Sequence, residues 1–281
     1  MKHQRPVAPN LTVSIVVYNS SLELLRSTLL SLRSAARQAL AAGLQGVDVI
    51  LVDNGSERDY QHRLRALAEE VCAEGTLALE VRTLPVNLGF GAGHNRALAR
   101  ATGDYHLILN PDVEIAEDAL AQGFRRLRDD TSVVMVSPLA VGGNGSREFL
   151  GKRYPSVLVL LLRAFMPGLG RRILPRRMAR YEMQDACTGD TEAPLLLASG
   201  CFMLVRGECL TAVEGFDERY FLYFEDFDLS LRLGRLGKLL FAPQVRIVHH
   251  GGYAARKGWR HLQMFMRSGL RFFNQHGWRW I

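Results

Sequence analysis

Strand-like apolar runs alternate with helix-like segments through the first half of this chain, and this alternation limits the fold more than any other feature. Runs rich in Val, Ile and Leu predict strands, and segments of helical periodicity predict the helices between them. The expected strands cover 12–18, 47–52, 77–84, 104–109 and 132–137, and the expected helices cover 22–42, 59–73, 94–101 and 117–128. Strands joined through helices pair in parallel, and a parallel sheet is covered on both faces. We therefore expect an α/β fold with a mostly parallel mixed sheet and helices on both faces.

The second half of the chain is less regular. Residues 142–194 mix Gly, Pro and Arg and predict an irregular, mobile excursion. After it, a strand is expected at 195–205, helices at 208–213, 224–237 and 258–275, and short strands at 238–243 and 245–250. A chain of 281 residues, 48% of them hydrophobic, is long enough for one large domain. We expect a single domain over 1–281 with two halves, 1–137 and 138–281.

Positive charge is concentrated in two segments. The chain has 35 Lys and Arg against 28 Asp and Glu, a formal charge of +7. Residues 147–180 carry +8 and residues 254–281 carry +6, so the remainder carries −7. Both segments interleave the bases with large apolar residues, which favours an anionic membrane surface as a partner. The alternatives are a buried helix with solvated Arg on its outer face and a contact in a homo-oligomer. No recognised nucleic-acid motif accompanies the charge.

Cysteine usage and hydropathy limit where the protein acts. Cys72, Cys187, Cys201 and Cys209 form neither a CxxC pair nor a Cys/His finger, so we interpret them as reduced thiols of a cytosolic protein. The sequence shows no apolar signal core near residue 1 and no run of about 20 apolar residues. We expect a cytoplasmic protein that binds peripherally to the inner face of the cell membrane.

Polar residues follow four of the expected strands. Tyr18 and Asn19 follow the first, Asp53 the second, Asn87 the third and Asp112 the fourth. In an open parallel sheet, ligands bind beyond the carboxyl ends of the strands. Asp and Asn also form ordinary turns, but four such strand ends converging on one crevice indicate a ligand site.

Glycine and acidic residues near these strand ends indicate what the ligand carries. The glycine-rich stretch 87–93, NLGFGAG, offers backbone N–H groups for a phosphate, or else forms a plain turn. Asp112 is placed to bind Mg²⁺ or Mn²⁺, or else starts the following helix. His249 ends another expected strand and can join a metal site near a carboxylate and a phosphate.

Three acids crowd one short aromatic segment of the second half. Glu225, Asp226 and Asp228 lie among Phe and Tyr residues at 221–227. Acids favour the first turn of a helix, which explains part of the pattern. Apolar neighbours also raise the pKa of a carboxyl and make its carboxylate a better general base.

These pieces, in this order, resemble the family 2 glycosyltransferases. The matching stretches are VSIVVYNS, VDVILVDNGS, NLGFGAGHNRALARATGDYHLILNPDVEI, ASGCFMLVRGECLTAVEGFDERYFLYFEDFDLSLRLGRLG and VRIVHHGG. NxGFGxGxN followed by LNPD, with the later FEDFDL, looks most like the rhamnosyltransferase branch. The resemblance implies a Rossmann-like sheet of the GT-A type, a nucleotide-diphosphate sugar donor with dTDP-rhamnose favoured, a divalent metal and inversion at the anomeric carbon. It also implies a lipid-linked or polysaccharide acceptor, with 1–137 binding the donor and 138–281 the acceptor.

The same resemblance implies roles for individual residues. Asp226 matches the general base, and Asp112 and His249 match the metal-binding positions. The positions expected to hold the nucleotide sugar are Val16, Tyr18, Asn19, Asp53, Asn87, Gly89, Asn95 and Asp112. The chain departs from the family at the metal motif DxD, which reads Asn110-Pro111-Asp112 here and keeps a single carboxylate. Mg²⁺ or Mn²⁺ held mostly by the diphosphate suits this variant.

Two other function classes compete with a glycosyltransferase. A nucleotidyltransferase on a similar sheet needs a glycine-rich loop with a basic residue directly after the first strand, and VVYNSSLELL has neither. A catalytically inert, membrane-associated assembly factor that keeps the fold is expected to lose Asp112 or Asp226. Both residues are present, so the enzyme is favoured.

Overall fold

A computed structural model describes residues 10–73, 75, 77–101, 103–166, 168, 172–251 and 258–281 of the chain. Residues 254–257 of the second basic segment, and 167 and 169–171 of the first, lie outside the described residues.

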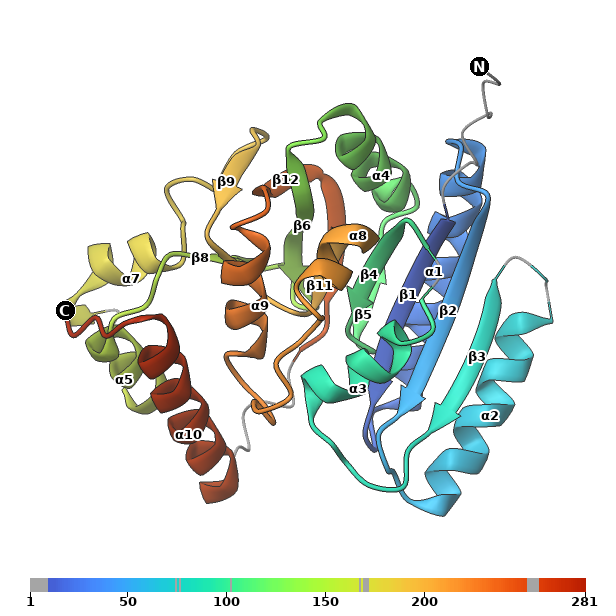
Figure 1. The fold of residues 1–281 in the computed structure, drawn as a ribbon, viewed down its shortest axis with the longest axis horizontal. Coiled ribbons are helices and arrows are strands. Elements are labelled where there is room, and N and C mark those ends of the chain that lie inside the picture. The colour runs from blue at the N-terminus through green and yellow to red at the C-terminus, as the bar shows by residue number, and fades with distance from the viewer. Residues whose placement is uncertain are drawn as a thin grey trace.

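Parallel strands from the first half form one side of the main sheet, in the order β3-β2-β1-β4 (Figure 1). Their bounds are Asn10–Val17 for β1, Gly46–Asp53 for β2, Ala78–Thr83 for β3 and Tyr105–Leu109 for β4. Val13 of β1 pairs with Val49 on one side and with Leu107 on the other. All three side chains are buried, as expected for strands covered on both faces.

The strands that follow β4 in the chain complete the sheet, which continues β4-β11-β6-β12-β5. Their bounds are Val113–Ile115 for β5, Val133–Gly142 for β6, Phe202–Arg206 for β11 and Lys238–His249 for β12. β11 lies antiparallel between β4 and β6, so the strand expected at 132–137 does not pair with its predecessor. β12 pairs in parallel with β6. Short strands extend the sheets: β7 (Arg147–Glu148) pairs with β6, β9 (Ala193–Leu195) with β12, and β8 (Gly151–Lys152) with β10 (Leu197–Ala198).

Helices cover both faces of this sheet, as the sequence predicted. α1 (Leu22–Ala41), α2 (Arg58–Cys72) and α4 (Ala119–Asp129) pack through one core, and α8 (Gly207–Ala212) and α9 (Glu225–Leu233) pack through a second. α3 (Phe90–Leu98) lies against β1 and β2. Ser21 caps the start of α1, because its Oγ accepts a hydrogen bond of 3.3 Å from the Leu24 amide.

A third group of helices lies at the end of the molecule opposite α2 (Figure 1). It comprises α5 (Val157–Phe165), α7 (Pro175–Tyr181) and α10 (Trp259–His276). These helices pack against the segment before α9 through an aromatic core, which is formed by Tyr181, Tyr220, Phe224 and Phe272. The excursion expected at 142–194 is therefore partly helical and packed. Among the described residues, no helix is long and apolar enough to cross a membrane.

Three element predictions were wrong in detail. α3 begins at Phe90, so Gly91 and Gly93 are helical rather than part of a loop. The strand expected at 195–205 is divided between β9, β10 and β11, by a bend at Leu196 and by a turn at 199–201. The two strands expected at 238–243 and 245–250 form the single strand β12, whose pairing shifts between Ala242 and Arg246.

Candidate functional site

Asp53 ends β2 and is fully buried. Its Oδ1 accepts a hydrogen bond of 3.1 Å from the Ser56 amide, whereas Oδ2 meets no donor among the described residues. A buried carboxylate oxygen without a donor is costly, so this atom is suited to accept a hydrogen bond from a ligand. Tyr18 directly follows Val17, the β1 residue that pairs with Asp53. Its side chain is 52% exposed, which leaves the ring free to contact that ligand. The Asn19 amide donates to Ser56 Oγ at 2.9 Å and joins the two turns.

Asn54 and Asn87 connect the turn after β2 to the glycine-rich segment. Asn54 Nδ2 donates to Asn87 Oδ1 at 3.0 Å and to the Gly89 carbonyl at 2.9 Å. Gly89 has a φ of +94°, and a Cβ there would lie 2.3 Å from the Phe221 carbonyl oxygen. Only glycine tolerates both the conformation and the contact. The segment at Asn87 and Gly89 is thus rigidly shaped and lies directly against the loop that precedes α9.

Val16 lies near this end of β1, and Asn95 lies on α3, the helix that packs on that strand. A Cβ on Gly93 would lie 2.8 Å from Val16 Cγ1, so α3 packs tightly on the end of β1. Asn95 Nδ2 donates to the Phe216 carbonyl at 2.8 Å, and Asn95 Oδ1 accepts from the Phe216 amide at 2.9 Å. Asn95 therefore uses its amide within the chain, where it holds the turn at Phe216 against α3.

Asp112 and His249 approach each other where β5 pairs with β12. His249 Nε2 lies 3.7 Å from Asp112 Oδ1, and that buried oxygen has no hydrogen-bond donor among the described residues. His249 Nδ1 lies 2.8 Å from Glu148 Oε2. Since a carboxylate only accepts, Nδ1 carries a proton in this contact. Glu148 thus orients the imidazole and turns Nε2 toward Asp112, as carboxylates bound to the far nitrogen of a metal-binding histidine do.

A neighbouring pair has a different role. His250 Nε2 lies 2.8 Å from Glu114 Oε1, and the His250 amide donates to the Asp112 carbonyl at 2.9 Å. These contacts fix the backbone around Asp112. Within the described part of the chain, no group of three or more His, Cys, Asp or Glu side chains is arranged to hold a metal ion. A cation here would therefore need further ligands from a substrate or from water.

The segment that precedes α9 is strained. Tyr223 and Phe224 have φ values of 72° and 67°, which are uncommon for aromatic residues. Ser268 of α10 holds this turn by donating to the Leu222 carbonyl at 2.8 Å, and the Tyr223 hydroxyl lies 3.0 Å from His261 Nδ1. Strain of this kind persists where the surrounding structure imposes it, often at functional sites. Here it turns the first residues of α9 toward a cavity.

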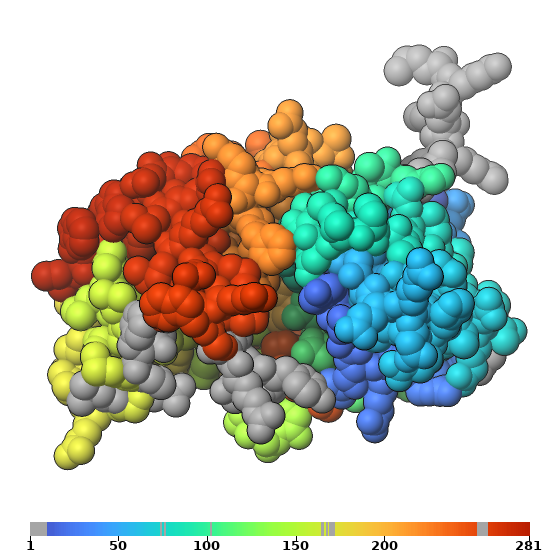
Figure 2. Space-filling view, turned by 90° about the horizontal axis from the view of Figure 1, so that it is seen from below, coloured from blue at the N-terminus to red at the C-terminus, as the bar shows by residue number. Residues whose placement is uncertain are grey.

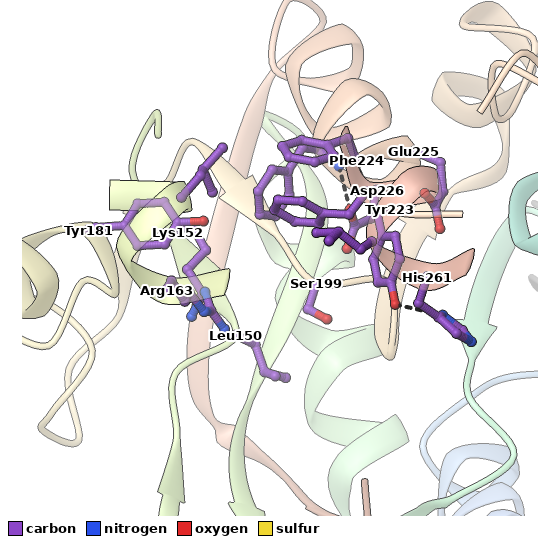
Figure 3. Close-up of a pocket in the computed structure, with 14 residues that line it drawn as sticks. Leu150, Lys152, Arg163, Tyr181, Ser199, Tyr223, Phe224, Glu225, Asp226 and His261 are labelled. Atoms are coloured by element: carbon purple, nitrogen blue, oxygen red, sulfur yellow. Dashed lines mark hydrogen bonds between the residues drawn. The ribbon is translucent and has the colours of Figure 1, made fainter. Parts of the chain in front are cut away.

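Asp226 lies in the first turn of α9 and faces that cavity (Figure 3). Its Oδ2 accepts a hydrogen bond of 3.0 Å from the Gly200 amide, and Oδ1 accepts one of 2.8 Å from the Phe227 amide. Burial raises the pKa of Asp226 to about 6, although the two amide hydrogen bonds act in the opposite direction. A carboxylate with this pKa is ionised at neutral pH and is a stronger base than an exposed Asp.

The two other acids of the cluster have different surroundings. Burial, and then the charge of Asp226, raise the pKa of Glu225 well above its ordinary value, which favours the neutral acid. Asp228 is fully buried and accepts hydrogen bonds from Arg232 Nε at 2.8 Å and Gln275 Nε2 at 3.0 Å, with His276 Nε2 also at 2.8 Å. Asp228 therefore joins α9 to α10, and Asp226 is the acid of the three whose carboxylate is both ionised and turned to the cavity.

The cavity has a volume of about 490 Å³ and lies between α9, α10, α5 and α7. Its polar lining includes Lys152, Arg163, Tyr181 and His261, and Figure 3 places Tyr181 and Arg163 across the cavity from His261. Burial lowers the pKa of Lys152 to about 8, and its Nζ donates to the Phe149 carbonyl. A cavity of this size, with polar groups from several elements, suits a small polar ligand such as a sugar unit.

One short turn joins the separate parts of the site. The Asn110 amide at the end of β4 donates to the Cys201 carbonyl at 2.9 Å, and the adjacent Gly200 amide binds Asp226. Burial, with smaller contributions from the charges of Asp112, Glu148 and Asp226, raises the pKa of the Cys201 thiol to about 12. This turn therefore links the strand end that leads to Asp112 with the cavity that contains Asp226.

Sequence reasoning missed Glu148, Lys152, Tyr223 and His261 as site residues. Glu148 is the single acid of the basic segment 147–180, and this isolation could have marked it as a candidate site residue. Lys152 was included only in the charge of that segment, although its side chain is buried. Tyr223 and His261 meet only because α10 packs against the strained turn, and no local pattern marks such a contact.

The comparisons with known proteins agree on the class of the chain. The sequence profile described as Glycosyl transferase family 2 matches residues 12–190. The N-acetylglucosaminyl-diphospho-decaprenol L-rhamnosyltransferase of Mycobacterium tuberculosis is 30% identical over 225 residues, covering 74% of this chain and 68% of that protein. Rhamnosyltransferase WbbL of Escherichia coli strain K12 is 29% identical over 180 residues, covering 60% of this chain and 63% of that protein.

Solved glycosyltransferase structures share the fold. GalNAc-T7 with UDP, GalNAc and Mn²⁺ matches with a TM-score of 0.65 at 16% identity, covering 96% of this chain and 48% of that one. The mannosyltransferase PcManGT from Pyrobaculum calidifontis, in complex with GDP-Man and Mn²⁺, matches with a TM-score of 0.62 at 20% identity, covering 95% of this chain and 65% of that one. The GT-A type fold expected from the sequence is confirmed.

Proposed function

Because this chain belongs to glycosyl transferase family 2 and is a glycosyltransferase similar to rhamnosyltransferases, we propose that it transfers rhamnose, with dTDP-rhamnose as the favoured donor, to a hydroxyl group. The acceptor is a lipid-linked saccharide or a polysaccharide, and the anomeric carbon inverts. The family expected from the sequence is confirmed, and the donor, acceptor and stereochemistry are our proposal.

The observation that carries this proposal is the single ionised carboxylate in the cavity. Asp226 keeps lone pairs for an acceptor hydroxyl beyond its two amide hydrogen bonds. In the reaction, Asp226 takes the proton of the acceptor hydroxyl while the oxygen of that hydroxyl forms a bond to the anomeric carbon. The bond from that carbon to the nucleotide diphosphate breaks on the opposite face. One base and one displacement invert the carbon, and no second carboxylate nucleophile is required.

The donor binds at the strand ends of the first half. The unsatisfied Oδ2 of Asp53 accepts a hydrogen bond from the base or the ribose, and Tyr18 contacts the base. Asn19, Asn87 and Gly89 shape the turns around the nucleotide. Val16 and Asn95 support this site through packing on α3 and the Phe216 turn.

A divalent cation, Mg²⁺ or Mn²⁺, fits the residues at the β5–β12 junction. Asp112 Oδ1 lacks a donor and the neutral form of His249 offers a lone pair at Nε2, so these two atoms would bind the ion, and Glu148 would orient the imidazole. When bound, such a cation offsets the negative charge that develops on the departing diphosphate. The two GT-A structures above contain Mn²⁺.

A membrane-bound acceptor agrees with the surface of the third helix group. Trp259, Trp278 and Trp280 are 70%, 42% and 63% exposed, and they lie on or next to α10. Figure 2 shows the red surface of this segment at one end of the face, with the blue surface of the first half at the other and the orange surface near residue 220 between them. Exposed Trp with nearby Arg suits an anionic membrane surface. We propose peripheral attachment at the cytoplasmic face.

The test is a donor and acceptor screen with the full chain. We expect nucleotide release from dTDP-rhamnose to increase when a diphospholipid-linked N-acetylglucosamine is added, and the product linkage to have the anomeric configuration opposite to the donor. A product with retained configuration would contradict the single-displacement mechanism. If every nucleotide sugar binds without turnover in all acceptor mixtures, the chain is an inert assembly factor.

A further inference from the structure

A second pocket, of about 330 Å³, lies beside the cavity and is lined by five arginines. They are Arg153, Arg176, Arg177, Arg180 and Arg279. Asp185 is the acid that neutralises one of them, since it pairs with Arg153 at 2.8 Å. Among the described residues, no carboxylate lies within ion-pairing distance of the other four. Four guanidinium groups without a directly paired carboxylate favour this pocket as a site for a polyanion.

The pocket is formed by three segments that bind one another. The Val157 amide donates to the Arg279 carbonyl at 2.8 Å, and the Tyr154 hydroxyl donates to the Gly277 carbonyl at 2.6 Å. Arg153 Nη1 donates to the Arg180 carbonyl at 2.7 Å and holds the end of α7. These bonds fix the backbone around the pocket. The guanidinium groups of Arg176, Arg177 and Arg279 remain available to a ligand.

Tyr181 separates this pocket from the cavity that contains Asp226, because its side chain lines both. The charge of Asp226 contributes to the raised pKa of Tyr181, behind the larger effect of burial, so the carboxylate acts electrostatically across the cavity on this ring. The Arg163 guanidinium lies 5.8 Å from the Tyr181 ring centroid on the cavity side. A ligand bound at the arginines can therefore extend past Tyr181 toward Asp226.

We propose that this arginine pocket binds the diphosphate of a lipid-diphosphate-linked acceptor and so holds the acceptor sugar at Asp226. The inference rests on the proposed function, because it assigns the acceptor class to the same site. Arginine binds a diphosphate through paired, charge-assisted hydrogen bonds, and the exposed Trp278 and Trp280, which precede and follow Arg279 in the chain, are suited to contact a lipid chain. The pocket thereby selects lipid-diphosphate acceptors over free saccharides.

The test measures binding without turnover, so it does not depend on glycosyl transfer. Farnesyl diphosphate is titrated into the full chain with saturating dTDP and Mg²⁺, which fill the donor site, and farnesol and inorganic pyrophosphate are titrated in parallel. The variant Arg176→Gln/Arg177→Gln/Arg279→Gln is compared with Arg58→Gln/Arg100→Gln/Arg235→Gln, which removes the same charge elsewhere. We expect farnesyl diphosphate to bind, farnesol to bind at least tenfold more weakly, and the pocket variant alone to lose about 100-fold in affinity.

The outcomes separate the possible sources of phosphate. Equal affinity of the pocket variant and the wild type for farnesyl diphosphate would overturn the proposal, as would equal losses in both variants. If the pocket variant keeps farnesyl diphosphate but no longer binds phosphatidylglycerol vesicles, the arginines serve the membrane surface and the proposal is wrong. Binding of farnesyl diphosphate that requires the pocket arginines supports the proposal even if no sugar is transferred, in which case the proposed function fails separately.

Discussion

The Gly200 amide donates a 3.0 Å hydrogen bond to Oδ2 of Asp226, and this bond joins the turn before β11 to the first turn of α9. Gly200 is adjacent to Cys201, whose carbonyl accepts from Asn110 at the end of β4. The end of β4 thereby helps to position a carboxylate of α9, a helix that follows β4 by over 100 residues in the chain. A rigid anchor of this kind is what a general base needs, because proton transfer requires a fixed distance to the hydroxyl.

Replacing Asp226 with Asn tests the base directly. We expect the Asp226→Asn variant to lose about 10²–10⁴-fold in kcat while its affinity for dTDP-rhamnose stays within about threefold, because the amide cannot accept the proton. Donor affinity is measured calorimetrically and kcat from nucleotide release. The exposed Asp190→Asn variant is the matched control and should be fully active. Near-normal turnover of Asp226→Asn would exclude this residue, and Glu225 would become the candidate.

The pH dependence of transfer follows from the raised pKa of Asp226. The base must be ionised, so kcat/KM should fall as the pH drops through about 6, by tenfold per unit below it. Lys152 lowers the pKa of Asp226 through its charge. Removing that charge in Lys152→Met should move the acidic limb to higher pH, whereas Lys238→Met on the far end of β12 should leave it in place. An acidic limb centred near 4 in the wild type would contradict the assignment.

The cation requirement can be tested through the carboxylate that orients His249. Glu148→Gln leaves Asp112 and His249 intact, yet it should raise the Mg²⁺ concentration needed for half-maximal activity by about 10–100-fold. Glu114→Gln disturbs the neighbouring His250 pair in the same manner and is the control, with little change expected. Full activity of the wild type in excess EDTA would show that Asp112 and His249 have another role.

Much of the donor side of the site could be predicted from local sequence. Asp53, Asn87 and Asp112 were identified because each follows an apolar run, and the end of a parallel strand is where ligands bind. The same local reasoning was wrong about the glycines at 91 and 93. Phe216 lies so close to Gly91, and Val16 so close to Gly93, that a larger side chain would not fit at either position of the helix. From the sequence alone, two such glycines look like part of a flexible loop.

The acceptor side could not be predicted in the same way. Lys152, Tyr181 and His261 come together only because α5, α7 and α10 pack around one aromatic core, and α10 is far from the other two helices in the chain. The basic segment was noticed for its charge, but charge alone does not distinguish a membrane surface from a folded pocket. The division into a donor half and an acceptor half, and the possible homo-oligomer, remain predictions.

Membrane attachment should depend on both charge and aromatic residues. We expect the chain to float with phosphatidylglycerol vesicles at low salt, and to lose most of this binding at 1 M salt, where the Debye length falls to about 3 Å. Trp278→Ser/Trp280→Ser should weaken flotation further, because these side chains are exposed. Arg172→Gln/Arg260→Gln/Arg267→Gln tests charges outside the arginine pocket, with Arg58→Gln/Arg100→Gln/Arg235→Gln as the control. Equal binding to neutral phosphatidylcholine vesicles would exclude the electrostatic contribution.

The buried pair His94 and His106 predicts how stability depends on pH. Ser14 Oγ lies 2.7 Å from His94 Nδ1 and 2.8 Å from His106 Nε2, and burial lowers the pKa of both imidazoles to about 3. The unfolded chain binds protons at these residues near pH 6.5, whereas the folded chain does not. Their stabilising contribution is therefore complete above about pH 6.5 and is lost as the pH falls toward 3, at about 1.4 kcal/mol per pH unit for each histidine.

A single substitution isolates this contribution from the other titrating groups. Burial raises the pKa of Glu225 and Asp226, which opposes the effect of the histidines on the pH dependence of stability. These two acids are present in both proteins, so their contribution cancels when the two free energies of unfolding are subtracted. We expect the free energy of unfolding of His106→Gln, measured with urea at pH 6.5, 5.5 and 4.5, to fall less steeply on acidification than that of the wild type, by about 1.4 kcal/mol per unit. His62→Gln, an exposed histidine of α2, should follow the wild type. Parallel curves for His106→Gln and the wild type would mean that the imidazole is protonated inside the fold.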